Sequence, residues 1–464
     1  MLRLHDTALG EVVELSLRDP GQVSLYVCGP TVYDDPHLGH GRFALVWDVL
    51  RRYLEWSGLA VRFVSNVTDV DDKIIARARR DGTTPAEVAQ RYEEVWYRTM
   101  DALGVRRPDH DPHATAYVAH MVELVEQLVD KGIAYETSDG VYFDVDGVDD
   151  YGALARQPLE TLRAGARVDV VEEKRSALDF ALWKKSEPDR PEGDPEWPSP
   201  WGPGRPGWHT ECVVMALDLL GEGFDLHGGG IDLAFPHHEN ERVQAEAVGR
   251  EFARRWVHSG FVVGPGGSKM SKSLGNYTSL VDLLDRNDPR AYRLLVLQSH
   301  YRAPLEVGPG SIERAERSLE RLDELARRAA GGTASPDPAA LDTFRSHMDD
   351  DLGTPAATAL LFELVAGANA GFDAGDTAAG ASLAAAALEM AGVLGLELRS
   401  GDERPDEEAA RLVAERDAAR AGRDFARADA IREELVGRGW TVKDTPEGTK
   451  LQRRRGGPEG PAAP

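Results

Sequence analysis

Residues 23–68 read VSLYVCGPTVYDDPHLGHGRFALVWDVLRRYLEWSGLAVRFVSNVT. The apolar run at their start predicts a buried strand that ends at Cys28. Apolar residues then recur at helical spacing over residues 43–54, and Gly58 ends this predicted helix. Residues 60–68 predict a second strand, so the whole stretch indicates a parallel βαβ unit of the doubly wound type. Ligands of such sheets bind beyond the carboxyl ends of the strands, which is where Cys28 lies.

Length and composition indicate a soluble globular protein. The chain has 464 residues, enough for about three domains of roughly 150 residues each, and 42% of its residues are hydrophobic. No run approaches the apolar length of a membrane span and the N-terminus lacks a secretory apolar region, so we expect a cytoplasmic protein without a membrane partner. The net charge of -25 argues against indiscriminate binding of DNA, although it does not exclude a local basic face.

Two short motifs suit the phosphates of a nucleotide. His37-Leu38-Gly39-His40 stands at the start of the predicted helix, where imidazoles, free N–H groups and the helix dipole favour an anion. Lys269-Met270-Ser271-Lys272-Ser273 lies in a glycine-flanked loop, which suits a mobile clamp on a triphosphate. A capping turn with two incidental histidines explains the first motif as well, and a flexible basic surface loop explains the second.

The two cysteines of the chain are candidate metal ligands. One disulfide between Cys28 and Cys212 could not stabilise a fold of this size. In a reducing compartment the two thiols are therefore buried hydrophobes, nucleophiles or metal ligands. His237 and Glu241 are four residues apart in a predicted helix and therefore project from one face. Together the four residues make a tetrahedral zinc set if they converge. No CxxC pairing supports this set, and a helix start with two buried cysteines remains the competing interpretation.

Other polar residues lie next to predicted strands. Thr68 and the acidic residues up to Asp72 precede a helical pattern, where they serve either as N-terminal caps or in an active site. Beyond the proline- and glycine-rich residues 187–208, the sequence GFDLHGGGIDL predicts a strand that enters a glycine loop. His227 and Asp232 would line the mouth of this loop, unless it is a bare turn.

Taken together, the motifs resemble those of a known family. The histidine motif and the lysine motif resemble the paired signatures of class I aminoacyl-tRNA synthetases, with leucine at position 38 where many relatives have isoleucine. YVCGPTVYD, NVTDVDDKI, GARVDVVEEKR, WPSPWGPGRPGWHTEC and LHGGGIDLAFPHHENE further resemble the cysteinyl-tRNA synthetases, and the resemblance covers nearly the entire chain. It implies activation of L-cysteine with ATP to cysteinyl-adenylate, followed by transfer to the terminal adenosine of tRNA(Cys).

The resemblance also implies roles for particular residues. ATP would be bound by residues of the two signatures, namely His37, Gly39, His40, Lys269, Ser271 and Lys272. Four of these would be catalytic: His37, His40, Lys269 and Lys272. One zinc ion per chain, which would select the substrate thiol, would be held by Cys28, Cys212, His237 and Glu241. The amino-acid pocket would be shaped by Thr68, Trp208, His227 and Asp232, with Asp232 on the substrate ammonium. Mg²⁺ would accompany ATP, and the protein would be a monomer.

The expected fold is α/β, with a Rossmann-like doubly wound parallel sheet as the catalytic domain. An inserted domain interrupts it, and an α-helical bundle and a small α+β C-terminal domain follow. The expected boundaries are 1–115 and 206–248 for the two halves of the catalytic domain, 116–205 for the inserted connective segment, 249–310 for the KMSKS loop and stem-contact region, 311–400 for the helical bundle, 401–455 for the anticodon-binding domain and 456–464 for a disordered tail.

Two other functions stay open on these residues. The first is the cysteine ligase of mycothiol synthesis, a relative that joins activated cysteine to an amino sugar; the acidic net charge suits such a small acceptor. The C-terminal module and the sequence Asp71-Asp72-Lys73 follow the synthetase pattern instead. The second is a noncatalytic synthetase-like module, against which the intact histidine and lysine signatures argue.

Overall fold

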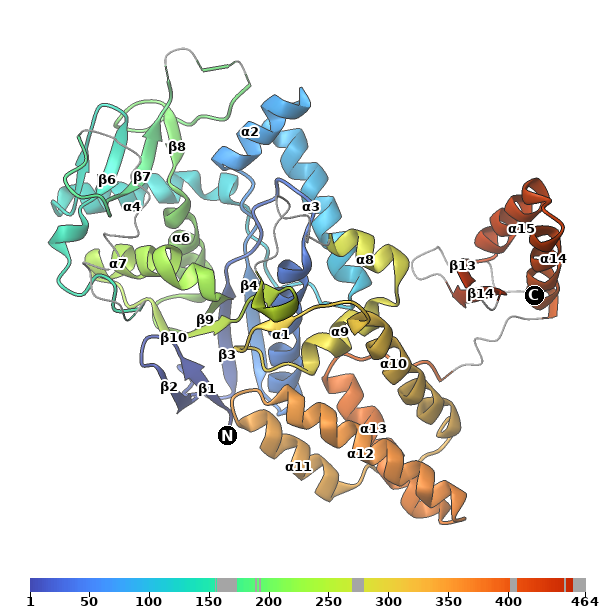
Figure 1. Cartoon of the computed structure of the whole chain (residues 1–464). Coiled ribbons are helices and arrows are strands. Elements are labelled where there is room, and N and C mark those ends of the chain that lie inside the picture. The colour runs from blue at the N-terminus through green and yellow to red at the C-terminus, as the bar shows by residue number, and fades with distance from the viewer. Residues whose placement is uncertain are drawn as a thin grey trace, which may run out of the picture. The chain divides into compact units, whose positions relative to one another are not determined.

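The computed structural model describes residues 1–154, 156, 173–187, 190–191, 193–268, 279–400, 407–445 and 448–453 (Figure 1). These belong to two compact units, one of residues 1–321 and 333–397 and one of residues 322–332 and 398–464. The predicted lysine motif at 269–273 and the predicted disordered tail lie outside the described residues.

A four-stranded parallel sheet is the centre of the larger unit. Its strand order is β10–β9–β3–β4. The strands are β3 (Gln22–Val27), β4 (Ala60–Ser65), β9 (Phe224–Gly230) and β10 (Ala253–Ser259). The predicted βαβ unit is confirmed, with α1 (Leu38–Trp56) connecting β3 to β4. The fourth strand, β10, comes from the range 249–310, so the sheet extends past the expected boundary at residue 248.

Helix α1 packs on the sheet and is held in place by ion pairs of the buried Asp48 side chain. A Cβ at Gly228 of β9 would lie 2.5 Å from the Trp47 ring, so the absence of a side chain there lets α1 approach the strand. On another side, Asp48 accepts from Arg293 of α9 (Pro289–Leu297) at 2.6 Å and from Arg52 at 2.8 Å. Burial raises the pKa of Asp48, but these two guanidinium groups outweigh burial and hold that pKa below its usual value.

An antiparallel sheet confirms the predicted insertion. Its strand order is β5–β6–β7–β8, and its strands are β5 (Ala134–Glu136), β6 (Gly140–Phe143), β7 (Phe180–Lys185) and β8 (Gly204–Pro206). Strands β5 and β6 pair antiparallel and form a hairpin. Helices α2 (Asp72–Asp81), α3 (Pro85–Ala102) and α4 (Val118–Asp130) lie between the two sheets in the sequence. Figure 1 shows α4 beside the strands of the insertion.

The larger unit contains further strands and helices. They are β1 (Arg3–Asp6), β2 (Glu11–Glu14), α6 (Trp208–Leu220), α7 (Glu239–Ala247), β11 (Val262–Val263), α8 (Leu280–Arg286), β12 (Leu305–Glu306), α11 (Pro338–Asp349), α12 (Thr354–Asp373) and α13 (Thr377–Val393). Helix α10 (Ser311–Arg328) runs from this unit into the smaller one.

By length and composition alone, helix α12 could cross a membrane, since it has 20 residues and an 18-residue stretch of it has a mean hydropathy of 1.2. This differs from our expectation that no run approaches such a length. The helix is part of the predicted bundle, where Leu361 and Val365 are buried. Gly371 of α12 meets Gly380 of α13 so closely that a Cβ on Gly371 would lie 2.9 Å from the Gly380 backbone. Its apolar character is therefore that of a core helix.

The smaller unit has the predicted α+β content. It comprises the end of α10, α14 (Glu407–Ala421), α15 (Phe425–Gly437), β13 (Trp440–Thr445) and β14 (Gly448–Arg453). The two strands pair antiparallel and form a hairpin. Leu412, Ile431, Leu435 and Trp440 form a small buried core between helices and hairpin.

Candidate active site

Three segments that are far apart in the sequence meet at the carboxyl end of the parallel sheet. Cys28 directly follows β3, and Cys212 lies in the second turn of α6. His237 lies in the short helical segment Ala234–His238, and Glu241 is in the first turn of α7. All four side chains are buried, and their ligand atoms lie within 4.8 Å of one another. We call these residues the Cys/His/Glu cluster; it is the predicted metal set.

Distances within the Cys/His/Glu cluster are those of groups that share one small ion. The two sulfur atoms are 3.6 Å apart, and Cys28 Sγ lies 3.3 Å from Glu241 Oε1. His237 Nε2 lies 3.7 Å from Cys212 Sγ and 2.8 Å from Glu241 Oε1. Two sulfurs, one imidazole nitrogen and one carboxylate oxygen are a donor set that zinc takes in tetrahedral sites.

Electrostatics in the Cys/His/Glu cluster also fit a cation. Burial raises the pKa of Glu241, but His237 and His227 outweigh burial and hold that pKa well below its usual value. Burial and the neighbouring Cys212 raise the pKa of the Cys28 thiol. Burial also acts to raise the pKa of Cys212, yet contacts with Cys28 and His237 bring it down to about 7. The Glu241 carboxylate is buried together with the Cys212 thiol, whose pKa is about 7. A bound cation would therefore let both cysteine thiols ionise.

Further histidines surround the Cys/His/Glu cluster and hold its ligands. His227 Nε2 lies 2.6 Å from Glu241 Oε2, and His209 Nδ1 lies 2.9 Å from His237 Nδ1. These contacts leave Glu241 Oε1 and His237 Nε2 directed at the cluster, which is how outer residues orient metal ligands. The indole of Trp208 stacks on the His237 ring at 4.0 Å and 16°. Sequence reasoning missed His209, which carries no spacing signal with His237.

An alternative grouping combines Cys28 and Glu241 with His227 and His238. The two groupings share a thiol and a carboxylate, so they describe sites for one ion rather than two. In the alternative grouping, His227 Nε2 already contacts Glu241 Oε2, and His238 Nδ1 contacts His258 at 2.9 Å. The Cys/His/Glu cluster has both sulfurs and is the better zinc site.

The predicted pocket residues lie in different surroundings. Thr68 is buried and donates to Glu211 Oε2 at 2.8 Å. Burial, and then Cys212, raise the pKa of Glu211 well above its usual value, although Thr68 acts in the opposite direction. Trp208 is half-buried, whereas Asp232 is exposed in the 3-10 turn Ile231–Leu233 that follows β9. The structure therefore brings Trp208 and His227 to the Cys/His/Glu cluster and places Asp232 at the surface beyond the strand.

The histidine motif forms the N-terminus of α1. His37 is the N-cap, and its Nδ1 accepts from the backbone N–H of His40 at 3.3 Å. The two rings are stacked at 3.7 Å and 16°. Burial and the adjacent His37 lower the pKa of His40 to about 3, so this imidazole is neutral. The capping interpretation holds, and it leaves a helix N-terminus with two imidazoles for an anion.

The described residues that flank the lysine motif are attached to the start of α1. After the motif, Ser279 forms an antiparallel bridge with His37, and Leu280 N–H donates to Pro36 O at 3.0 Å. Before the motif, Arg42 donates to the carbonyl of Phe261 at 2.5 Å. Both flanks thus lie next to the histidine motif, although the lysines themselves are outside the described residues.

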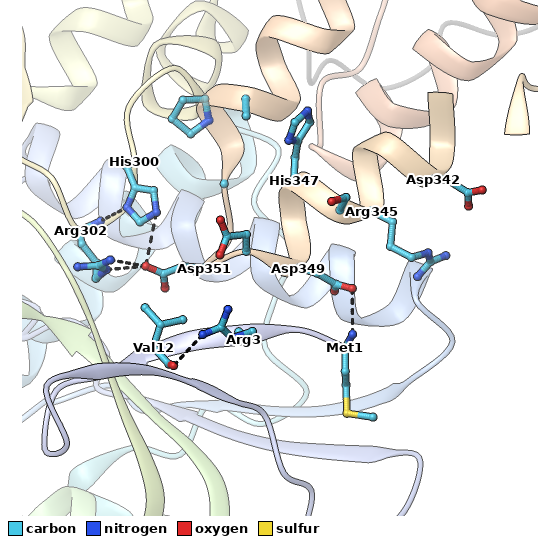
Figure 2. A pocket seen from close by; sticks show the side chains of 15 residues that line it. Met1, Arg3, Val12, His300, Arg302, Asp342, Arg345, His347, Asp349 and Asp351 are labelled. Atoms are coloured by element: carbon cyan, nitrogen blue, oxygen red, sulfur yellow. Dashed lines mark hydrogen bonds and ion pairs between the residues drawn. The ribbon is translucent and has the colours of Figure 1, made fainter. Parts of the chain in front are cut away.

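A cavity of about 930 Å³ lies elsewhere, beside the N-terminal hairpin of β1 and β2 (Figure 2). Asp351 on its wall accepts from His5 N–H at 2.9 Å, from the Tyr301 hydroxyl at 2.7 Å and from Arg302. Figure 2 also shows the N-terminal amine of Met1 paired with Asp349. None of the predicted site residues that the structure describes lines this cavity.

Comparison with known proteins finds two family models. The model described as "tRNA synthetases class I (C) catalytic domain" matches residues 14–317, and the model described as "DALR domain" matches residues 343–399. The cysteine--tRNA ligase of Halorhodospira halophila is 44% identical in an alignment of 465 positions that covers 98% of this chain and 100% of the relative. The cysteine--tRNA ligase of Alkalilimnicola ehrlichii is 46% identical in an alignment of 468 positions that covers 98% of this chain and 100% of that relative.

Solved structures of other synthetases share the fold. Mycobacterium tuberculosis methionyl-tRNA synthetase in complex with methionyl-adenylate superposes with a TM-score of 0.59 at 18% identity, covering 80% of this chain and 89% of that one. The leucyl-tRNA synthetase of Agrobacterium radiobacter K84, in a ternary complex, superposes with a TM-score of 0.62 at 13% identity, covering 82% and 84%. At such identities the likeness concerns the fold alone.

Proposed function

The chain belongs to the cysteine--tRNA ligases, a family of class I aminoacyl-tRNA synthetases, and from this we propose that its Cys/His/Glu cluster holds the zinc ion that selects the substrate thiol. The observation that carries the proposal is the convergence of four buried donors within 4.8 Å. When bound, zinc supplies a soft ligand site that suits a thiolate and suits the harder, less acidic serine hydroxyl poorly. A site built around one functional group rejects analogues by roughly 10⁴-fold, so no editing domain is needed.

The protein's own residues prepare this selection. His209 and His227 fix the orientation of His237 and Glu241, and burial excludes the water that would compete for the ligands. Trp208, stacked on His237, forms a wall of the amino-acid pocket. His227 shapes the pocket through Glu241 rather than by touching the substrate. Asp232, exposed beyond β9, is the proposed partner of the substrate ammonium.

The chemical steps fall to the two signatures. A carboxylate oxygen of cysteine attacks the α-phosphorus of ATP, and the bond to the β-phosphate oxygen breaks to release pyrophosphate. A ribose hydroxyl of the terminal adenosine of tRNA then takes the cysteinyl group and releases AMP. His37 and neutral His40 donate to phosphate oxygens at the start of α1, where Gly39 lets the nucleotide approach. Lys269, Ser271 and Lys272 would close on the pyrophosphate, with Mg²⁺ sharing the charge.

The acceptor distinguishes the proposal from its alternatives. Purified protein is given cysteine and ATP with either tRNA or glucosaminyl-inositol, and the esterified or amidated product is measured. We expect cysteinyl-tRNA and no amide. An amide of the amino sugar would identify the mycothiol ligase, and the absence of cysteine-dependent exchange of pyrophosphate into ATP would identify a noncatalytic module.

Two further proposals follow from the family. We expect the enzyme to act as a monomer in the cytoplasm, and light scattering at micromolar concentration tests the first point. We assign tRNA anticodon reading to the smaller unit, whose helices and hairpin have a core of their own.

A further inference from the structure

The acidic residues of the segment NVTDVDDKI have structural partners. Asp71 is the N-cap of α2 and accepts from the backbone N–H of Lys73 at 2.9 Å. Asp72 accepts from Lys184 Nζ at 2.6 Å and from Arg205, both in the inserted sheet. These contacts cap α2 and attach it to the insertion. They leave the Lys73 side chain without either acid as a partner.

A third acidic residue, Asp69, also has hydrogen-bond partners. Its two oxygens accept from the backbone N–H of Thr115 at 2.9 Å and from the Thr115 hydroxyl at 2.5 Å. Among the described residues, no carboxylate forms an ion pair with the Lys73 ammonium. An ammonium group that is exposed and has no counter-ion is available to an anionic ligand.

Aromatic rings define where this ammonium lies. Lys73 Nζ is 5.4 Å from the centroid of the Tyr33 ring and 5.9 Å from that of the Trp208 ring. Both rings attract a cation through their faces. Trp208 in turn stacks on His237 of the Cys/His/Glu cluster, so the ammonium lies at the wall of the amino-acid pocket.

The ammonium is also near the nucleotide motif. Burial and His37 are the main causes that lower the pKa of His40, and the positive charge of Lys73 contributes next. The positive charge of Lys73 therefore acts on the histidine motif, and its ammonium lies beside the pocket wall formed by Trp208. In adenylate formation, the cysteine carboxylate must meet the α-phosphate of ATP between these two places.

We propose that Lys73 is an additional substrate-binding residue, whose ammonium binds the anionic oxygens where the cysteine carboxylate joins the α-phosphate. This rests on the proposed placement of ATP at His37–His40 and of cysteine at the Cys/His/Glu cluster. The carboxylate oxygen forms a bond to the α-phosphorus while the bond to the β-phosphate oxygen breaks, and pyrophosphate leaves with the electron pair. Lys73 keeps its proton throughout and neutralises a non-bridging α-phosphate oxygen.

The test compares Lys73→Met with Arg80→Met in the cysteine-dependent exchange of pyrophosphate into ATP. Among the described residues, Arg80, an exposed cation of the same helix, pairs only with Asp81, at 3.3 Å, so its loss changes the net charge equally. We expect Lys73→Met to lower kcat/KM by about 10²-fold, Lys73→Arg to recover much of the loss, and Arg80→Met to stay within about twofold of the wild type.

Zinc content, melting temperature and the preference for cysteine over serine separate binding from a structural role. We expect all three to stay at wild-type values in Lys73→Met, because the side chain is exposed. Exchange by Lys73→Met within about twofold of an active wild type would overturn the proposal while leaving the proposed function intact. A loss that Lys73→Arg does not recover, accompanied by loss of zinc or a lower melting temperature, would also overturn it. An inactive wild type would instead refute the proposed function.

Discussion

The two halves of the candidate site are built in different ways. In the Cys/His/Glu cluster, every donor is buried and lies within 4.8 Å of the others. At the histidine motif, His37 and His40 are half-buried, and the lysines that would complete the site precede, in the sequence, a flank attached through Ser279. The donors proposed to hold zinc are thus buried, whereas the imidazoles proposed to bind ATP lie on an accessible edge. Changes in one half should leave the function of the other intact.

The largest effect is expected from Cys212→Ser, in the Cys/His/Glu cluster. The loss of a thiolate should release zinc and reduce the preference for cysteine over serine from roughly 10⁴-fold to about tenfold. Metal analysis and exchange assays with both amino acids measure this, with Val213→Ala, a buried neighbour on the same helix, as the control. A Cys212→Ser enzyme that keeps zinc and still rejects serine would contradict the assignment of this ligand.

Lys272→Ala tests the accessible half. Removal of a cation from the leaving pyrophosphate should lower cysteine-dependent exchange by roughly 10³-fold, while zinc content and melting temperature stay unchanged. Robust activation of cysteine by this variant would remove the lysine motif from the reaction. Loss of zinc would show that the two halves are not independent.

His227→Gln should have a smaller effect, because His227 holds Glu241 and does not belong to the cluster. We expect zinc affinity to fall by about 10- to 100-fold in competition with a chelator. His258→Gln is a control one contact further out, since His258 touches His238 and Thr7. Equal losses in both variants would mean that burial in general, rather than orientation of Glu241, sustains the site.

Asp71→Ala should give the smallest effect. Loss of the N-cap of α2 should cost about 1 kcal/mol in the free energy of unfolding, measured by urea denaturation. Exchange should fall by less than about fivefold, because only the helix end that carries Lys73 frays, and zinc content should not change. A large loss of exchange at wild-type stability would give Asp71 a direct role and reopen the active-site interpretation of these acids.

Local patterns allowed much of this fold to be predicted. The apolar spacing of residues 43–54 predicted α1, and the apolar runs on either side of it predicted β3 and β4. Strand β10 was not predicted within the range 249–310, because this strand is defined by pairing with β9 rather than by its own sequence. The core role of α12 likewise depends on a close approach of glycines across two helices.

The residues of the candidate site also differ in whether a local sequence pattern predicts them. His237 and Glu241 share a helix face, so their spacing is a sequence signal. Cys28 and Cys212 converge with them only because β3 pairs with β9, which is about two hundred residues away in the sequence. His209 and Lys73 contact the site through tertiary packing, and no local sequence pattern predicts such contacts. The resemblance to a family supplied the metal set that spacing alone left open.

Zinc K-edge X-ray absorption of the purified enzyme, with and without cysteine, tests the central claim most directly. The account predicts about one zinc per chain with two sulfur neighbours at about 2.3 Å, and a third sulfur when cysteine is added but not when serine is added. An unchanged sulfur count on addition of cysteine, or an enzyme that lacks zinc and still rejects serine, would contradict it.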